Sequence, residues 1–303
     1  MRIAIIGAGF AGFALAYHLS SNHTIRLFHA GGGASRIAAG LLHPYPGEQG
    51  RRSWKADEGL LATTRLLAIV EEALGRPVAD RSPILRKLTP QQRPIFAAHA
   101  ETYQDVILQE DGCLITSGMT IDATLYLEGL QRACQVREVE YIEKRISSLS
   151  ALQGYDQIIL AAGAGALAFA ECVPLDLRTI KGQILTCAPR PLEKSLISKG
   201  YLIKAEDGLY LGATFERAFT SDAPDLAVAS QLLQSKLHHF SELVGELEVT
   251  GCRAAVRVAM PHHYTPFVGQ VGEKCWAVTG LGSRGLLYHA YLAETLCNNS
   301  CFL

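Results

Sequence analysis

Three glycines near the start of the chain have the spacing with which a backbone can bind a phosphate. Gly7, Gly9 and Gly12 form a Gly-x-Gly-x-x-Gly sequence directly after a short apolar run. In such a turn the first glycine permits the sharp bend, the second lets the backbone approach a pyrophosphate, and the third lets a helix pack close to a strand. The helix N-terminus adds free N–H groups and the positive end of its dipole. This spacing predicts dinucleotide binding.

A strand, a tight turn and a helix must position these glycines. Residues 3–6 are Ile-Ala-Ile-Ile, and residues 10–19 contain no proline. Two other interpretations compete, namely a secretory signal and a βα unit whose glycines are incidental. A signal peptide is disfavoured because one charge precedes the apolar stretch and three glycines interrupt it. The dinucleotide interpretation therefore leads.

A second strand, predicted over residues 24–28, is followed by a loop made largely of small residues. An acidic residue that binds a ribose usually closes such a strand, but His29 stands there and no Asp or Glu follows before Glu48. Histidine can hydrogen-bond a ribose hydroxyl, and it is equally suited to a half-exposed strand end. The loop runs from a triple glycine through Ser35 and Arg36 to Gly40, and could wrap closely around a flat ligand.

Two further strands are predicted to end in small residues. The strand over 156–160 ends in Ala-Ala-Gly163, and the strand over 275–279 passes into Gly280-Leu-Gly282-Ser-Arg-Gly285 and a helix to about residue 296. The second glycine turn again aims a helix N-terminus at a ligand. His262 and His263 precede it, and they are acid–base candidates or simply solvated loop residues.

The remaining pattern predicts an α/β protein with two discontinuous parts. Helices are expected over 53–75 with Ser53 as cap, over 90–103 and over 227–244, and Asp122 is expected to cap another. Residues 136–142 alternate like a strand. We predict a Rossmann-like dinucleotide-binding domain formed by 1–45, 111–170 and 253–303. A mainly antiparallel β-sheet with helices, formed by 46–110 and 171–252, is inserted into it as the substrate domain.

The composition is that of an ordinary soluble globular protein, with 49% hydrophobic and 19% charged residues. A net charge of −1 predicts no broad electrostatic hold on nucleic acid. Eight cysteines show no Cys-x-x-Cys pair, so we expect no metal site and reduced thiols in a cytoplasmic protein. No long apolar run exists beyond the glycine-broken N-terminus, which predicts no membrane span.

The glycine turns and the Ala34-Ser35 segment together resemble the D-amino-acid oxidase and glycine oxidase family of FAD enzymes. Within that family, Ala34-Ser35…Gly40, Gly251…Arg253…Arg257 and Leu281-Gly-Ser-Arg-Gly-Leu286 are most similar to the FAD domain of the bifunctional enzymes that modify tRNA wobble uridine. Those enzymes oxidise a carboxymethylaminomethyl group on C5 of uridine and release glyoxylate. The resemblance implies an FAD oxidoreductase. FAD is expected to bind non-covalently, because Ile37 stands where some relatives carry a flavin-linked histidine.

The resemblance also implies which residues line the cofactor. Ser35 and Arg36 are expected beside the phosphates, Ala39 to Leu41 beside the flavin, and Ile146 against the adenine. The full set of expected cofactor-binding residues is Gly7, Gly9, Phe10, Ala11, Gly12, His29, Ser35, Arg36, Ala39, Gly40, Leu41, Ile146, Ala162, Gly163, Gly182, Gly280, Gly282, Ser283, Arg284, Gly285 and Leu286.

Flavin-dependent amine oxidation needs an anchored substrate and no metal. An arginine is the natural anchor for a carboxylate. Glycine-oxidase-like relatives use two arginines and a tyrosine, and their motifs point to Arg257, Arg284 and Tyr201 here. Each has a structural alternative, which is a salt bridge for Arg257, a flavin contact for Arg284 and packing for Tyr201.

The expected function is oxidation of the C–N bond of an amino-acid-like or N-substituted glycine substrate by hydride transfer to FAD. Three alternatives remain, namely oxidation of the side arm of a tRNA uridine, an NAD(P) enzyme and a non-catalytic flavin-binding protein. Six basic residues could form a local basic rim for tRNA, namely Arg36, Arg51, Arg52, Lys55, Lys181 and Lys204. The small-molecule substrate, the electron acceptor and the oligomeric state are left open.

Overall fold

A six-stranded sheet contains the N-terminal glycine turn. The computed structural model describes residues 1–263, 265–299 and 302, and orders this sheet β16-β17-β10-β1-β2-β9. All its strands run parallel except β16, which pairs antiparallel with β17. The strands are β1 (Arg2–Ile6), β2 (Thr24–His29), β9 (Glu140–Glu143), β10 (Gln157–Leu160), β16 (Phe267–Gly272) and β17 (Cys275–Thr279).

Alternate residues of β1 enter two different cores. Ile3 and Ile5 pack into one, whereas Ala4 and Ile6 pack into the other. Successive side chains of a strand point to opposite faces, so a strand buried on both faces is apolar throughout. Helices cover the first face, and they are α1 (Phe10–Leu19), α2 (Ala56–Leu74), α4 (Ala123–Val136) and α6 (Gly285–Cys297). Short 3₁₀ turns cover the second, and they are η2 (Leu149–Leu152), η3 (Gly163–Ala168) and η4 (Ala170–Leu175).

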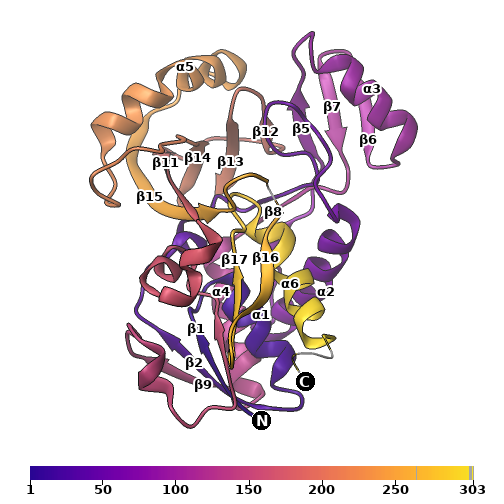
Figure 1. The fold of residues 1–303 in the computed structure, drawn as a ribbon. Helices are drawn as coiled ribbons and strands as arrows, with labels where there is room; N and C mark the ends of the chain where they lie inside the picture. The colour runs from indigo at the N-terminus through magenta and orange to yellow at the C-terminus, as the bar shows by residue number, and fades with distance from the viewer. Residues whose placement is uncertain (264, 300–301, 303) are drawn as a thin grey trace.

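A second sheet of eight strands lies above the first in Figure 1. Its order is β15-β11-β14-β13-β12-β5-β7-β6, with every pair antiparallel except β12 and β5. Its strands are β5 (Ile84–Lys87), β6 (Val106–Gln109), β7 (Gly112–Ile115), β11 (Arg178–Cys187), β12 (Leu196–Ile197), β13 (Tyr201–Ala205), β14 (Gly208–Gly212) and β15 (Val249–Ala259).

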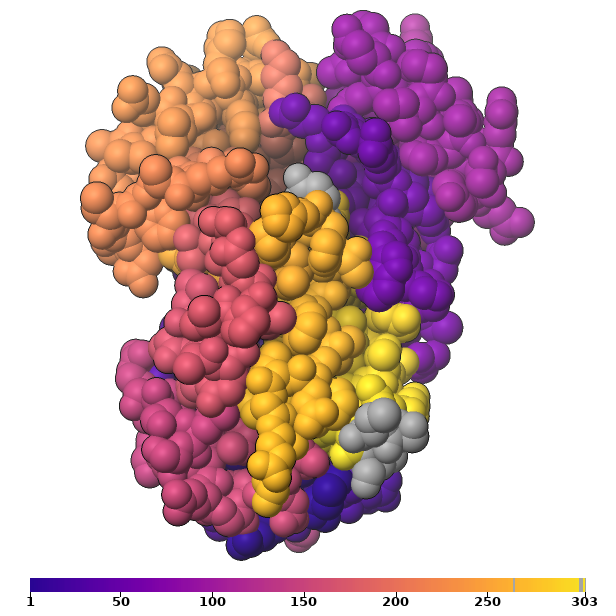
Figure 2. Space-filling view, in the orientation of Figure 1, coloured from indigo at the N-terminus to yellow at the C-terminus, as the bar shows by residue number. Residues whose placement is uncertain are grey.

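The outer face of this sheet is closed by α5 (Leu226–Val244) at one end, and α3 (Arg93–Thr102) packs at the other. Leu185, Leu209 and Leu211 point toward α5 and pack against its Ala229 and Leu233. Figure 2 shows these two ends at the upper left and upper right of the molecule, with a golden segment near residues 260–280 below and between them. A small sheet joins the two parts, and it consists of β3 (Leu41–Leu42), β8 (Met119–Ile121) and β4 (Ala79–Asp80).

The α/β fold with a second, mainly antiparallel sheet is as predicted, and several local details are confirmed. Asp122 caps α4, because its carboxylate accepts hydrogen bonds from the N–H groups of Thr124 and Leu125. Two local predictions were wrong. Ser53 is not the cap of α2, since Lys55 takes that position in the left-handed region at φ 49°. Residues 136–142 do not form one strand, because α4 continues to Val136 and β9 begins at Glu140.

Three segments lie elsewhere than the predicted domain division places them. Helix α2 packs into the core shared by α1, α4 and α6, not into the large sheet. Strand β7 pairs with β5 in the eight-stranded sheet, and residues 253–259 continue β15 there. Strand pairing and the apolar face of α2 determine which sheet or core each segment joins, whereas the sequence shows only local periodicity.

Candidate functional site

The carboxyl ends of four parallel strands meet at one edge of the six-stranded sheet. Gly7 follows β1, His29 ends β2, Gly163 lies beyond β10, and Gly280 follows β17. Strand β1 is followed along the chain by β2, which is its neighbour in the sheet on one side, and its neighbour on the other side is β10. In open α/β sheets such a reversal of strand order opens a crevice for a ligand at the carboxyl edge. The glycine motifs named from the sequence therefore converge on one place.

The first glycine turn is packed too closely for any side chain. Gly7 has φ 110°, and a Cβ atom there would lie 2.7 Å from the carbonyl carbon of Ala161. A Cβ atom on Gly12 would overlap the carbonyl oxygen of Gly7. The predicted close contact between helix and strand is therefore present. Ser35, far along the chain, accepts a hydrogen bond from the Phe10 N–H at 3.1 Å and thus lies at the start of α1.

Two helices aim bare N-termini at this region. Neither α1 nor α6 has a side-chain cap or an acidic residue in its first turn. By contrast α4 and α5 are capped by aspartates, and α2 has two acidic residues in its first turn. Uncapped N–H groups with the positive end of the helix dipole suit an anionic ligand such as a pyrophosphate.

His29 forms a flat surface beside this turn. Its ring stacks on Tyr141 with centroids 4.1 Å apart and 13° between the planes. Among the described residues its buried Nδ1 has no hydrogen-bond partner. Burial lowers the pKa of His29; the Glu143 charge opposes this shift and the Arg36 charge adds to it, and because the net shift is downward the neutral ring is favoured. A neutral ring nitrogen without a partner is suited to a ribose hydroxyl.

These features fit the shape and charge of FAD. Gly40 lies at φ 90°, and a Cβ atom there would overlap the Ile121 carbonyl oxygen, so only glycine permits this approach of the loop. Gly163 at φ 55° faces open space. Ile146 is buried beside Phe28 in the core below the carboxyl edge. FAD, when bound, would lie across residues that this edge brings together.

Gly182 lies elsewhere, in the eight-stranded sheet under Arg257. A Cβ atom on Gly182 would lie 2.9 Å from Nη1 of Arg257, so the absence of a side chain lets the guanidinium lie flat on the sheet. Strand pairing puts Gly182, Gly212, Tyr201 and Arg257 on the same face, opposite the face that α5 covers.

Arg257 is the candidate anchor for a substrate carboxylate. Within the described residues it makes no hydrogen bond and no ion pair, although the Phe215 ring lies 5.7 Å from its Cζ. Burial lowers its pKa, which reflects the free energy of holding this charge without an anion. A half-buried arginine without a carboxylate is an unusual feature, since buried charges are normally paired.

Tyr201 lies close to Arg257 on the same face. Burial raises the pKa of Tyr201 to about 12, although the Arg257 charge opposes that shift. The phenol therefore stays protonated near neutral pH and can donate a hydrogen bond. A donor hydroxyl and a guanidinium together can bind one carboxylate. The structure thus brings Tyr201 and Arg257 together, as the resemblance implied.

Arg284 lies on a different element, at the N-cap of α6. Its neighbour His43 has a pKa lowered to about 3, by burial first and then by the charges of Arg86 and Arg284. The Nδ1 of His43 faces the Tyr45 N–H at 3.3 Å. In that pairing Nδ1 accepts, so the ring is neutral with its proton on Nε2. No sequence pattern points to His43 apart from its place after the Ala-Ala-Gly run.

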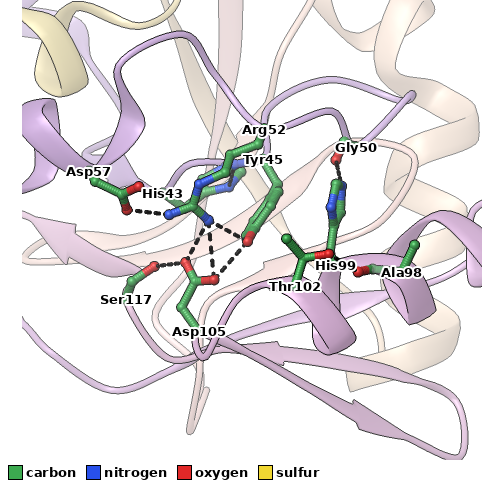
Figure 3. Close-up of polar contacts among 10 residues, drawn as sticks. All are labelled: His43, Tyr45, Gly50, Arg52, Asp57, Ala98, His99, Thr102, Asp105 and Ser117. Atoms are coloured by element: carbon green, nitrogen blue, oxygen red, sulfur yellow. Dashed lines mark hydrogen bonds and ion pairs between the residues drawn. The ribbon is translucent and has the colours of Figure 1, made fainter.

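Arg52 belongs to a hydrogen-bonded network that sequence reasoning missed (Figure 3). Its Nη1 lies 3.2 Å from Asp105, its Nη2 contacts Asp57, and it bonds to the Tyr45 hydroxyl. Burial raises the pKa of Asp105, but hydrogen bonds from Ser117 and Tyr45 and the Arg52 charge outweigh it, so the net shift is downward. The partners lie 53 residues apart in sequence, and no local pattern predicts them.

The basic rim expected for tRNA is smaller than predicted. Lys181 is only 4% exposed and donates to the carbonyls of Ser221 and Ala223. Arg52 is held by Asp105, and Lys55 pairs with Glu58 at 2.6 Å. Arg36, Arg51 and Lys204 are exposed and form no ion pair with the residues that the structure describes, although the Arg36 side chain hydrogen-bonds to Tyr141.

The two adjacent histidines are solvated loop residues. His262 and His263 are both exposed, and His263 Nδ1 lies 3.1 Å from the Thr265 carbonyl oxygen.

Near Arg36 and Ala39 the surface is hollowed into a cavity of about 610 Å³, which Tyr210 and Arg253 line from the large sheet. In the described part of the chain no helix has the length and apolar character to cross a membrane.

Comparison with known proteins agrees with this geometry. A family model described as FAD dependent oxidoreductase (DAO) matches residues 2–298. The tRNA 5-methylaminomethyl-2-thiouridine biosynthesis bifunctional protein of Maricaulis maris is 27% identical over 98% of this chain and 51% of its own length. Its counterpart in Idiomarina loihiensis is 33% identical over 41% of this chain and 21% of its own length. The chain thus spans about half, or less, of these relatives.

Solved structures share the fold over nearly the whole chain. Glycine oxidase from Geobacillus kaustophilus matches with a TM-score of 0.79 at 18% identity, covering 97% of this chain and 93% of that one. Iminodiacetate oxidase from Chelativorans sp. BNC1 matches with a TM-score of 0.76 at 19% identity, covering 98% and 94%. L-proline dehydrogenase from P. horikoshii matches with a TM-score of 0.75 at 14% identity, covering 98% and 92%.

Proposed function

Since this chain belongs to the FAD dependent oxidoreductase (DAO) family, we propose that it oxidises the C–N bond of an N-substituted glycine or a similar amino acid. The observation that carries this proposal is Arg257, a half-buried cation with no anionic partner among the described residues. A substrate carboxylate would supply that partner. FAD, when bound, accepts a hydride from the carbon next to the substrate nitrogen.

The residues of the chain have distinct tasks in this proposal. Arg257 binds the carboxylate, and Tyr201 donates a second hydrogen bond to it, so that the far end of the substrate is fixed. Arg284 and the N-terminus of α6 hold positive charge beside the cofactor. The substrate carbon loses a hydride and its nitrogen loses a proton, which leaves an imine. Water then splits the imine into an oxo acid and an amine.

Residues at the carboxyl edge of the six-stranded sheet would hold the cofactor non-covalently. The uncapped start of α1, Ser35 and Arg36 suit the pyrophosphate, and His29 suits the ribose. Gly280, Gly282 and Ser283 would approach the flavin ahead of α6. Ile37 has no nucleophilic atom with which to form a covalent flavin bond.

Replacing Arg257 tests the substrate anchor. In Arg257→Ala we expect FAD to remain bound with an oxidised flavin spectrum. Anaerobic reduction by the best N-substituted glycine should weaken by about 10²-fold, because a charge-assisted bidentate contact is lost. The matched control is Arg178→Ala, since Arg178 is exposed on β11 and its ion pair among the described residues is with Asp176. Reduction at the wild-type rate by Arg257→Ala would contradict the anchor.

A second candidate substrate is a modified uridine in tRNA. Two relatives named for tRNA 5-methylaminomethyl-2-thiouridine biosynthesis favour it, and Arg51 and Lys204 are exposed to contact phosphates. If tRNA binds through these residues, its affinity should fall steeply as salt is raised, with a slope of about −1 per phosphate contact. Affinity that ignores salt would remove tRNA from consideration.

A further inference from the structure

Phe215 is an exposed aromatic side chain beside the proposed carboxylate anchor. More than half of it, 55%, is accessible to solvent. Its ring centroid lies 5.7 Å from Cζ of Arg257 and 5.4 Å from Cζ of Arg217. Both guanidinium groups therefore lie within cation–π distance of the ring, which still leaves more than half of its surface accessible.

The segment around Phe215 is fixed to strand β11. The Thr214 N–H donates to the Gln183 carbonyl at 2.9 Å, and Glu216 and Lys181 exchange two backbone hydrogen bonds, at 3.0 Å for the Glu216 N–H. The Thr214 hydroxyl also accepts a hydrogen bond from the Gln183 N–H at 2.8 Å. The hydrogen bonds of its two neighbours to β11 therefore fix the backbone at Phe215, so its exposure does not result from an unattached loop.

The alternation of side chains decides where Phe215 points. Thr214 is 4% exposed, and Glu216 accepts a hydrogen bond from the Gln183 amide at 3.2 Å. Because neighbouring side chains of an extended segment point to opposite sides, Phe215 turns away from them. It faces the side on which Arg257 lies over Gly182.

An exposed ring next to a carboxylate anchor is suited to a substrate that carries its own flat ring. Bases stack on exposed aromatic side chains, and this stacking tolerates any planar ring. A carboxymethylaminomethyl arm has four bonds of about 1.5 Å between its carboxyl carbon and the ring, or about 5 Å when extended. That length is similar to the 5.7 Å between Cζ of Arg257 and the ring centroid of Phe215. Glycine itself has nothing to place on the ring.

We propose that Phe215 is a stacking platform for a pyrimidine ring whose glycine-type side arm Arg257 binds. This inference rests on the proposed function and names its substrate class. Phe215 is thereby a specificity-determining residue, which distinguishes a nucleobase-linked glycine from a free amino acid. It binds the part of the substrate that does not react.

The test compares two ligands, 5-carboxymethylaminomethyl-uridine and sarcosine, on the FAD-loaded enzyme. Calorimetry measures binding, and anaerobic bleaching of the flavin measures reaction. In Phe215→Leu we expect the Kd for the nucleoside to rise about 5- to 150-fold, the range for loss of one stacked base. The Kd for sarcosine should stay within about two-fold. Phe215→Trp should restore nucleoside binding.

The matched control is Phe219→Leu, in the same segment but half-buried, which should leave both affinities unchanged. Unaltered nucleoside binding by Phe215→Leu, equal weakening of both ligands, or no nucleoside binding to the wild type would overturn the platform. The two readouts separate this proposal from the proposed oxidation. Phe215-dependent binding without bleaching would retain the platform and reject the oxidation. Bleaching by sarcosine without any effect of Phe215 would do the reverse.

Discussion

At the scale of single residues, two arginines without carboxylate partners among the described residues differ in how their charge is held. Arg86 is 1% exposed and donates to the carbonyls of Tyr45 and Gly47 at 2.8 and 2.7 Å. The Phe96 ring lies 4.9 Å from its Cζ. Arg257 has no such acceptors among the described residues. We infer that Arg86 stabilises the loop after β3, whereas Arg257 can bind an anionic ligand.

This difference predicts opposite effects on stability. Arg86→Met should lower the free energy of unfolding by about 2–4 kcal/mol, because two buried carbonyls lose their donor. Arg257→Met should leave it unchanged or raise it by about 1 kcal/mol, because an unpaired buried charge is removed. Urea unfolding of the cofactor-free protein measures both. A loss for Arg257→Met as large as that for Arg86→Met would show Arg257 to be structural.

At the scale of elements, buried polar contacts fix the helices and the loop around the site. The Tyr126 hydroxyl of α4 lies 2.8 Å from Nε2 of His289 on α6, and both residues are fully buried. His289 Nδ1 lies 3.0 Å from the Leu286 carbonyl oxygen, so it carries the proton and Nε2 accepts from Tyr126. Phe10, at the start of α1, packs against both rings. This contact links the two uncapped helix ends.

Protonation of His289 should weaken this link. Burial lowers its pKa to about 4, against about 6.5 in an unfolded chain. Between these values the unfolded chain binds more protons, so stability is complete above about pH 6.5 and falls by up to about 1.4 kcal/mol per unit as pH decreases toward 4. We expect His289→Gln to lose this part of the pH dependence.

Urea unfolding near pH 7 and near pH 5 measures the effect. His238→Gln, at an exposed position on α5, is the control and should keep the wild-type pH dependence. If the free energy of unfolding of His289→Gln depended on pH as in the wild type, protonation of His289 would not be the cause of that dependence.

The Arg52 network should owe its stabilising effect to its buried partner alone. The side chain of Asp105 is 14% exposed, whereas that of Asp57 is 74% exposed. Asp105→Asn should therefore cost about 2–4 kcal/mol of unfolding free energy, and Asp57→Asn less than about 0.5 kcal/mol. Thermal or urea unfolding compares the matched pair. Equal costs would show that burial does not set the strength of these ion pairs.

At the scale of the whole molecule, the predicted cofactor residues come from segments far apart in the chain. Gly9, Ser35, Gly163 and Gly280 follow different strands or loops, yet they lie along one edge of the six-stranded sheet. A ligand that contacts all of them binds only the folded chain, and it must therefore stabilise the whole fold by mass action.

FAD should consequently raise the unfolding midpoint of the cofactor-free protein. At 100 times the Kd, the stabilisation expected is about 2.7 kcal/mol. Gly9→Ala should reduce this effect at equal FAD, because the new Cβ atom would lie 2.8 Å from Ser35 Oγ at the start of α1. Gly165→Ala is the control, since its Cβ atom would meet only ordinary contact at 3.5 Å. Differential scanning fluorimetry with added FAD distinguishes them.

Features that depend on neighbouring residues could be predicted from the amino-acid sequence. The glycine turn at Gly7 to Gly12, the Asp122 cap and the apolar parallel strands all follow from local backbone geometry and side-chain period. The family resemblance, carried by those same motifs, gave the fold and FAD. The folded chain was needed to show that Arg257, Tyr201 and Phe215 lie on one side of the large sheet, that Arg52 is paired, and that α2 joins the first core. These contacts depend on strand register and packing between distant segments, which no local pattern encodes.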